Sequence, residues 1–89
     1  MNVVLMSVYS GDRVDWFSKA FDSIDFSCID LALVGVDGPV QENLANKLMQ
    51  IQSESVHVLW FERNEGLGST LNKLIAYAKD CNDVSLFFR

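Results

Sequence analysis

The chain has 89 residues, 49% of them hydrophobic, and its 12 acidic and 7 basic side chains give a formal net charge of -5 at pH 7. This length suits one domain with a modest core, and the composition is globular rather than disordered. The acidic balance disfavours nonspecific binding to nucleic acid or to anionic membranes. An anionic ligand would therefore need local backbone amides or a metal ion.

The first half of the chain predicts two strands, each followed by a helix. Residues 3–9 form an apolar run, too short for a signal sequence or a membrane span, which favours a cytoplasmic location or the cytoplasmic face of a larger protein. A helix is expected over residues 13–24, capped by Asp12. Residues 29–36 predict the second strand, and Pro39 the start of the second helix. The apolar stripes of these helices are Val14, Phe17, Phe21 and Ile24, then Leu44, Leu48 and Ile51.

The second half continues the alternation. Residues 56–61 predict a strand, and the helix after residues 64–68 carries the stripe Leu71, Leu74, Ile75 and Ala78. Residues 84–88 predict a last strand. Continuous apolar strands that alternate with helices indicate a parallel sheet covered on both faces. We expect one domain over residues 1–89, a three-layer Rossmann-like α/β fold with the layout (βα)3β.

Polar residues follow two of these strands at the edge where parallel α/β sheets bind ligands. Tyr9 leads into Ser10-Gly11-Asp12, and the second strand leads into Asp37-Gly38-Pro39. Both segments also suit ordinary turns. Likewise, the pair Gly66 and Gly68 lacks the third glycine of a dinucleotide-binding fingerprint and suits a plain loop before a helix.

Other conspicuous residues have structural interpretations. Cys28 and Cys81 follow no metal-binding spacing and are expected to be reduced, half-buried thiols. His57 has no acid or cysteine nearby in the sequence and is expected to be a strand residue without a catalytic role. Trp16 and Trp60 lie in apolar patterns and are expected in the core.

The order of these segments resembles the start of a family 2 glycosyltransferase. The resemblance is carried by Ser7-Val8-Tyr9, Val36-Asp37-Gly38-Pro39, the spacing Asn64-x-Gly66-x-Gly68-x-x-x-Asn72 and a strand ending at Arg89. It implies an incomplete nucleotide-sugar-binding domain of the A-type fold, with strand order 3-2-1-4. The family often has two acids where this chain has Val36 and Asp37.

The resemblance also implies roles for single residues. Ser7, Val8 and Tyr9 would surround the nucleotide base, Val8 through its backbone, and Asp37 would accept a hydrogen bond from the base, usually uracil. Asn64, Gly66, Gly68 and Asn72 would form the loop and helix start beside the nucleotide. Glycines let backbone approach a ligand closely, and a helix amino end favours anions.

In the family, the metal-binding Asp-x-Asp motif and the catalytic base come after the strand that matches residues 84–88. We therefore expect no catalytic or metal-binding residue in this chain, and Mg or Mn only in the intact enzyme. That enzyme would be an inverting glycosyltransferase of polysaccharide biosynthesis, moving a sugar from a uridine-linked donor to a saccharide or lipid-linked acceptor. The chain alone would be inactive, and its last strand, as an exposed apolar edge, could form a homodimer.

Two other functions fit less well. A noncatalytic receiver-like or flavodoxin-like interaction module would use Asp12 and Asp37, but a receiver places an aspartate after its third strand, where this chain has Glu62-Arg63-Asn64. A sugar-nucleotide pyrophosphorylase-like enzyme needs a basic, glycine-rich loop after the first strand. Residues 10–13 are too short and insufficiently basic for that loop.

Overall fold

The computed structural model describes residues 2–78, and residues 85–88 as a strand without side chains. Its elements follow the chain as an alternation of strands and helices. They are β1 (Asn2–Val8), α1 (Val14–Asp22), β2 (Leu31–Asp37), α2 (Glu42–Ile51), β3 (Val56–Phe61), α3 (Leu67–Ala78) and β4 (Ser85–Phe88).

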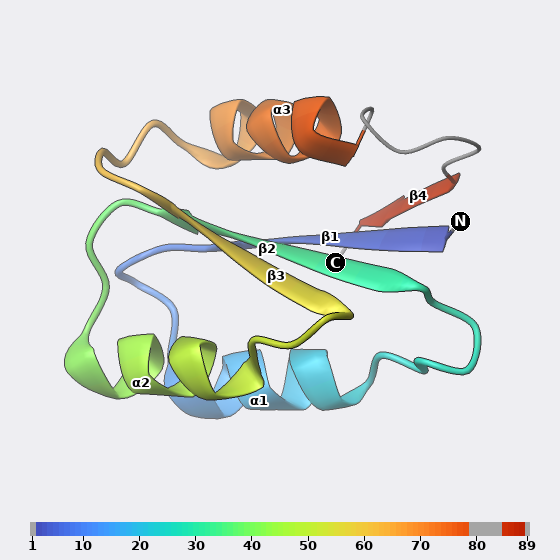
Figure 1. Cartoon of the computed structure of the whole chain (residues 1–89). Coiled ribbons are helices and arrows are strands. Elements are labelled where there is room, and N and C mark those ends of the chain that lie inside the picture. The colour runs from blue at the N-terminus through green and yellow to red at the C-terminus, as the bar shows by residue number, and fades with distance from the viewer. Residues whose placement is uncertain (1, 79–84, 89) are drawn as a thin grey trace.

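The strands form one parallel sheet in the order β3-β2-β1-β4. Helices α1 and α2 lie on one face of this sheet and α3 lies on the other (Figure 1). The predicted α/β class, with a parallel sheet and three helices, is confirmed, and the arrangement is compatible with a Rossmann-like fold.

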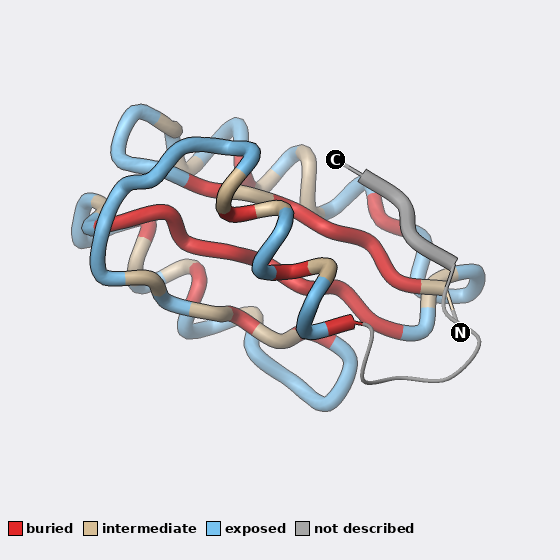
Figure 2. Tube along the Cα trace, turned by 90° about the horizontal axis from the view of Figure 1, so that it is seen from above, coloured by how far each residue is buried: buried red, intermediate tan, exposed pale blue. Residues whose placement is uncertain are grey.

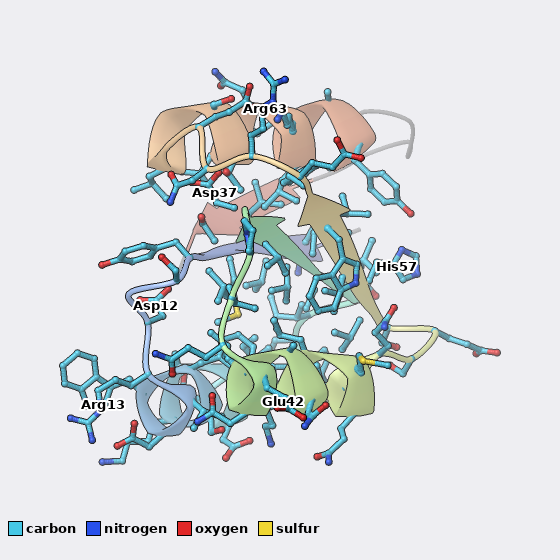
Figure 3. All side chains as sticks on the ribbon, turned by 90° about the vertical axis from the view of Figure 1, so that its left-hand side faces the viewer. Asp12, Arg13, Asp37, Glu42, His57 and Arg63 are labelled. Carbon is cyan, nitrogen blue, oxygen red and sulfur yellow. The ribbon has the colours of Figure 1, made fainter. Side chains whose placement is uncertain are left out.

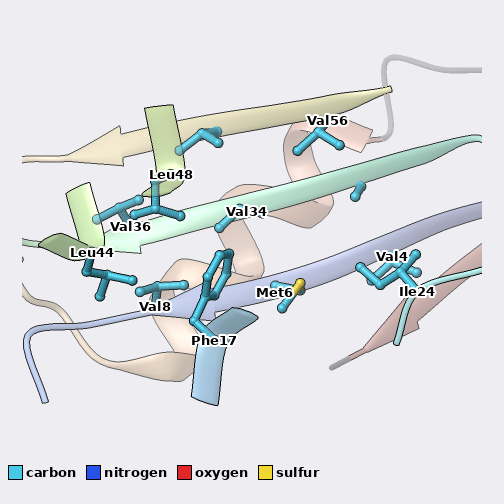
Figure 4. Close-up of a cluster of buried hydrophobic side chains, with 12 residues drawn as sticks. Val4, Met6, Val8, Phe17, Ile24, Val34, Val36, Leu44, Leu48 and Val56 are labelled. Carbon is cyan, nitrogen blue, oxygen red and sulfur yellow. The ribbon is translucent and has the colours of Figure 1, made fainter. Parts of the chain in front are cut away.

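Side chains alternate between the two faces of the sheet, so each strand contributes to two cores. Along β1, Val4, Met6 and Val8 face α1 and α2, where they pack with Phe17 and Leu48 (Figure 4). The intervening positions face α3, and this second cluster consists of Val3, Leu5, Leu31, Leu33, Leu74 and Ala78. Figure 2 shows the result, with buried positions running along the central strands. The strands are continuously apolar because both faces are covered.

Helix α1 is shorter than predicted and is not capped by Asp12. Its N-cap residue is Arg13, which makes no capping side-chain hydrogen bond. Asp12 instead closes a turn with Tyr9, so its carboxylate is already engaged before the helix begins. The helix ends at Asp22, although Ile24 beyond it is buried as the apolar spacing predicts.

The second strand and second helix both start later than predicted. Residue 29 donates its amide to the Asp25 carbonyl in a turn, and β2 begins two residues later at Leu31. Pro39 does not start α2, which begins at Glu42 after an extended Gln41. The buried positions Leu44 and Leu48 match the predicted stripe.

The prediction that both tryptophans are core residues is wrong. Trp16 is 61% exposed and Trp60 is 46% exposed. Trp60 lies on β3, an edge strand of the sheet, and therefore has a strand neighbour on one side only. Cys28 is also exposed rather than half-buried, and it is a free thiol.

Several predictions fall outside the described residues. These concern Cys81, Val84 and Arg89, together with the side chains of Leu86, Phe87 and Phe88, so the side chains of the expected dimer edge lie outside the described residues. Within the described part of the chain, no helix has the length and apolar character needed to span a membrane.

Candidate functional site

The strand register brings Ser7 and Asp37 to the same face of the sheet near its carboxyl edge. Ser7 is aligned with Gly35 of β2, and Asp37 follows Gly35 by two residues, so both side chains point toward α3. Figure 3 views the molecule from this edge, with Asp37 just beneath α3 and Asp12 on the connection from β1 to α1. The polar residues that follow two different strands therefore meet at one end of the fold.

Asp37 holds the loop that precedes α3. Its side chain is only 3% exposed. Its Oδ1 accepts a hydrogen bond from the Glu65 amide at 2.8 Å, and its Oδ2 accepts one from the Gly66 amide at 2.9 Å. Amides at a helix start have no carbonyl partner within the helix, and a negative charge there is favoured by the helix dipole. Asp37 thus caps α3 from a neighbouring strand.

Gly38 packs this loop against the end of β2. Its φ is +86°, a left-handed conformation that side chains disfavour, and a Cβ at this position would lie 2.8 Å from the Asn64 nitrogen. Gly66 also has a positive φ, of +92°, but its Cβ would meet nothing within 4 Å. Gly66 therefore borders open space, whereas Gly38 is enclosed.

Tyr9 lies at the same end of the sheet, directly after β1. The Asp12 amide donates to the Tyr9 carbonyl at 3.0 Å, and the Tyr9 amide donates to Asp12 Oδ2 at 3.0 Å. These two bonds fix the turn after β1, while the Tyr9 side chain remains 48% exposed.

These segments enclose a hollow of about 520 Å³, a volume typical of small-molecule sites. Its residues come from the ends of β1 and β2 and from the start of α3, and they are Ser7, Tyr9, Asp12, Asp37, Asn64, Gly66 and Leu67. Among the residues that the structure describes, the lining has two carboxylates and no basic side chain. It therefore suits a neutral, hydrogen-bonding ligand group better than an anion.

Three residues assigned to the nucleotide by the resemblance do not line this hollow. The Val8 side chain is buried on the opposite face of the sheet, against α1 and α2. Gly68 and Asn72 are exposed on α3. Asn72 is about 200° around the helix from the buried Thr70, because each helical residue advances about 100°.

Leu67 is a lining residue that sequence reasoning missed. It precedes Leu71 by four residues and Leu74 by seven, so helical spacing alone would place it in the core. In the structure it is 61% exposed, because the first turn of α3 lies at the edge of the sheet. Leu67 differs from the core leucines in its position relative to the ends of the neighbouring strands, which its spacing in the sequence does not reveal.

The outer side of the same loop carries an ion pair. Lys73 bonds to the Glu65 carboxylate, and its Nζ lies 4.6 Å from the centre of the Phe61 ring. Ser69 also donates to Glu65, at 3.3 Å. The hydrogen bond and charge of Lys73 hold the pKa of Glu65 below its ordinary value. Glu65 thus fixes the loop through its amide on one side and through its carboxylate on the other.

His57 lies away from this site. Its Nδ1 is 3.0 Å from the Tyr77 hydroxyl, and the two rings meet edge to face with centroids 6.0 Å apart. The pair links β3 to α3, consistent with a packing role for His57.

The carboxylates of the site do not form a metal centre. Asp12 and Asp37 each accept backbone amides, and over residues 2–78 no three His, Cys, Asp or Glu side chains come together as ligands. The described residues therefore offer no cluster of three such ligands for a Mg or Mn ion.

Comparisons with protein-family models, curated proteins and solved structures gave no match for this chain. The glycosyltransferase family therefore remains a prediction based on the resemblance of its motifs.

Proposed function

We propose that this chain is the nucleotide-sugar-binding portion of an inverting glycosyltransferase, and that the hollow between Tyr9 and Leu67 receives the base of a uridine-linked donor. One observation carries the proposal. Two large, exposed apolar side chains face a hollow whose wall also holds the carboxylate of Asp37.

The apolar walls suit a flat ring. Tyr9 offers an aromatic face for stacking and Leu67 an aliphatic surface, and each side chain exposes about half of its area or more. A base inserted between them would cover this surface from water. The sugar and phosphates would then extend toward solvent.

The polar groups suit a pyrimidine edge. Each Asp37 oxygen accepts one backbone amide and retains a second acceptor direction, so the carboxylate can still accept an N–H from uracil. The Ser7 hydroxyl and the Asn64 amide supply donors and acceptors on either side. A phosphate gains less here, since the carboxylate of Asp37 already accepts the two amides that precede α3.

In the intact protein, we propose transfer of the sugar to a saccharide or lipid-linked acceptor in polysaccharide biosynthesis, at the cytoplasmic side. The described residues bind and orient the base in this scheme. The proposal for this chain rests on binding of the base alone.

The two hydrogen bonds that Asp37 accepts from the Glu65 and Gly66 amides also favour a second candidate function. Because this carboxylate stabilises the loop without any ligand, the chain could be a noncatalytic α/β module that binds a nucleotide or another protein. Such a module would have the same fold and the same hollow at the carboxyl edge of the sheet, but it would discriminate little between nucleotides.

An NMR titration with uridine diphosphate, uridine and adenosine diphosphate tests the proposal. We expect shifts of Ser7, Tyr9 and Asn64 with both uridine compounds, and weaker ones with the adenine compound. Tyr9→Ala should weaken binding about tenfold, from loss of the stacking and apolar contact of the ring. Tyr77→Ala, which removes a similarly exposed tyrosine elsewhere, should leave binding unchanged. Absence of shifts in the folded protein would contradict the proposal, and equal shifts with all three compounds would favour the noncatalytic module.

A further inference from the structure

We propose that Gly11, which does not itself line the hollow, is the residue that positions the Tyr9 ring as one of its walls. The inference rests on the proposed base-binding function for its consequence, but the ring placement can be tested without a ligand. The resemblance to glycosyltransferases assigns no role to Gly11.

The Tyr9 ring occupies the space that a side chain at position 11 would need. A Cβ built on Gly11 would lie 2.5 Å from Tyr9 Cε2 and 2.8 Å from both Cζ and the hydroxyl oxygen. Carbon atoms normally approach no closer than about 3.5 Å. The outer half of the ring therefore lies across the glycine, in space that any side chain would occupy.

The surrounding backbone cannot easily yield to a larger residue. Tyr9 and Asp12 close the turn around Gly11 with two hydrogen bonds, and β1 fixes the backbone before it. A side chain at position 11 would therefore move the ring rather than the turn. The ring would either enter the hollow and narrow it or swing outward and remove the wall.

Gly11 is well suited to this test because its backbone is not strained. Its φ lies outside the left-handed range, and the residue is exposed, so alanine is compatible with the local backbone. Gly38, by contrast, combines a positive φ with close backbone contact and would report mainly on folding.

The ligand-free protein gives the first readout. In the wild type we expect nuclear Overhauser contacts between the Gly11 α-protons and the outer Tyr9 ring protons, with the α-protons shifted by the ring. In Gly11→Ala the ring resonances should move and its contacts with residue 11 should be reorganised. An unchanged ring environment in the variant would overturn the proposal.

Binding of uridine diphosphate gives the second readout, through a double-mutant cycle. Gly11→Ala should weaken binding about threefold to tenfold, which is the range of an aromatic contact. In a Tyr9→Ala background the same change should have no effect, because the ring is already gone. An equal loss in both backgrounds would overturn the proposal.

Glu54→Ala is the control. Glu54 is exposed in the turn before β3 and does not line the hollow, so this variant should change neither the Tyr9 ring nor the affinity. If the wild type binds no uridine compound while the ring shifts as expected in Gly11→Ala, the proposed function fails and the positioning role of Gly11 stands.

Discussion

The carboxylate of Asp37 accepts the backbone amide of Gly66 at 2.9 Å, although the two residues are 29 positions apart in the chain. With the parallel bond to Glu65, this contact ties the end of β2 to the start of α3. The residue that the resemblance assigns to the base is therefore also a structural residue. Loss of binding in an Asp37 variant consequently cannot separate contact with the base from damage to the loop, and stability must be measured beside it.

Asp37→Ala should lower the free energy of unfolding by about 2–4 kcal/mol, because it leaves two amides at a helix start without their charged acceptor. Asp37→Asn should cost less, since one carbonyl oxygen remains to accept a bond. Urea unfolding followed by circular dichroism measures both. Asp15→Ala, which removes an exposed carboxylate, serves as the control. Equal stability of Asp37→Ala and the wild type would show that the hydrogen bonds from the Glu65 and Gly66 amides to Asp37 are not formed.

Gly38→Ala should destabilise the protein by more than about 1 kcal/mol, because alanine combines an unfavourable positive φ with a clash against Asn64. The Asn64 amide resonance should shift as the loop moves. Gly68→Ala, at an unstrained helical position, should be neutral or slightly stabilising. Similar unfolding midpoints for these two alanine variants would count against the described packing of Gly38.

Two leucines of α3 should separate stability from binding. Leu74 is fully buried, and Leu74→Ala should cost about 2–5 kcal/mol. Leu67 is 61% exposed, so Leu67→Ala should leave the unfolding midpoint nearly unchanged while weakening uridine diphosphate. Thermal unfolding and calorimetric titration together test this contrast. A large stability loss in Leu67→Ala would place that side chain in the core instead.

The interaction of Glu65 with Lys73 predicts a pH dependence of the loop. Because the pKa of Glu65 is lowered in the folded protein, its stabilising contribution is complete above the ordinary value of 4.5 and is lost as the pH falls through the lower folded value. NMR titration of the Glu65 carboxyl carbon should show this lowered midpoint. Lys73→Gln should move the midpoint back toward 4.5, whereas Lys47→Gln should not. A midpoint that Lys73→Gln leaves unchanged would exclude the ion pair as its cause.

Local patterns were sufficient for much of the fold. The apolar run over residues 56–61 matches β3, because a short apolar segment between two turns has few stable structures other than a buried strand. Ser7 and Asp37 were expected at one edge, and strand parity brings them to one face. Helix α2 starts at Glu42 rather than at Pro39, because Pro39 is compatible with an extended approach as well as with a first helical turn.

The contacts that shape the hollow could not be predicted from local patterns. The two amides bound by Asp37 belong to a loop 28 and 29 residues away, and sequence spacing says nothing about such pairs. Asp12 suited a helix cap, but its turn with Tyr9 uses the same carboxylate. The exposure of Leu67 and Trp60 depends on where the sheet ends, which is a tertiary property.

Two carboxylates of the described residues that line the hollow have a kinetic consequence for a charged ligand. Asp12 and Asp37 face an approaching diphosphate within a chain of net charge -5, so its association is opposed at long range. Salt screens this repulsion over a Debye length of about 10 Å at 0.1 M. The association rate of uridine diphosphate should therefore rise with ionic strength, while that of uncharged uridine stays nearly constant. An acidic entrance of this kind would admit the nucleoside end of a donor first.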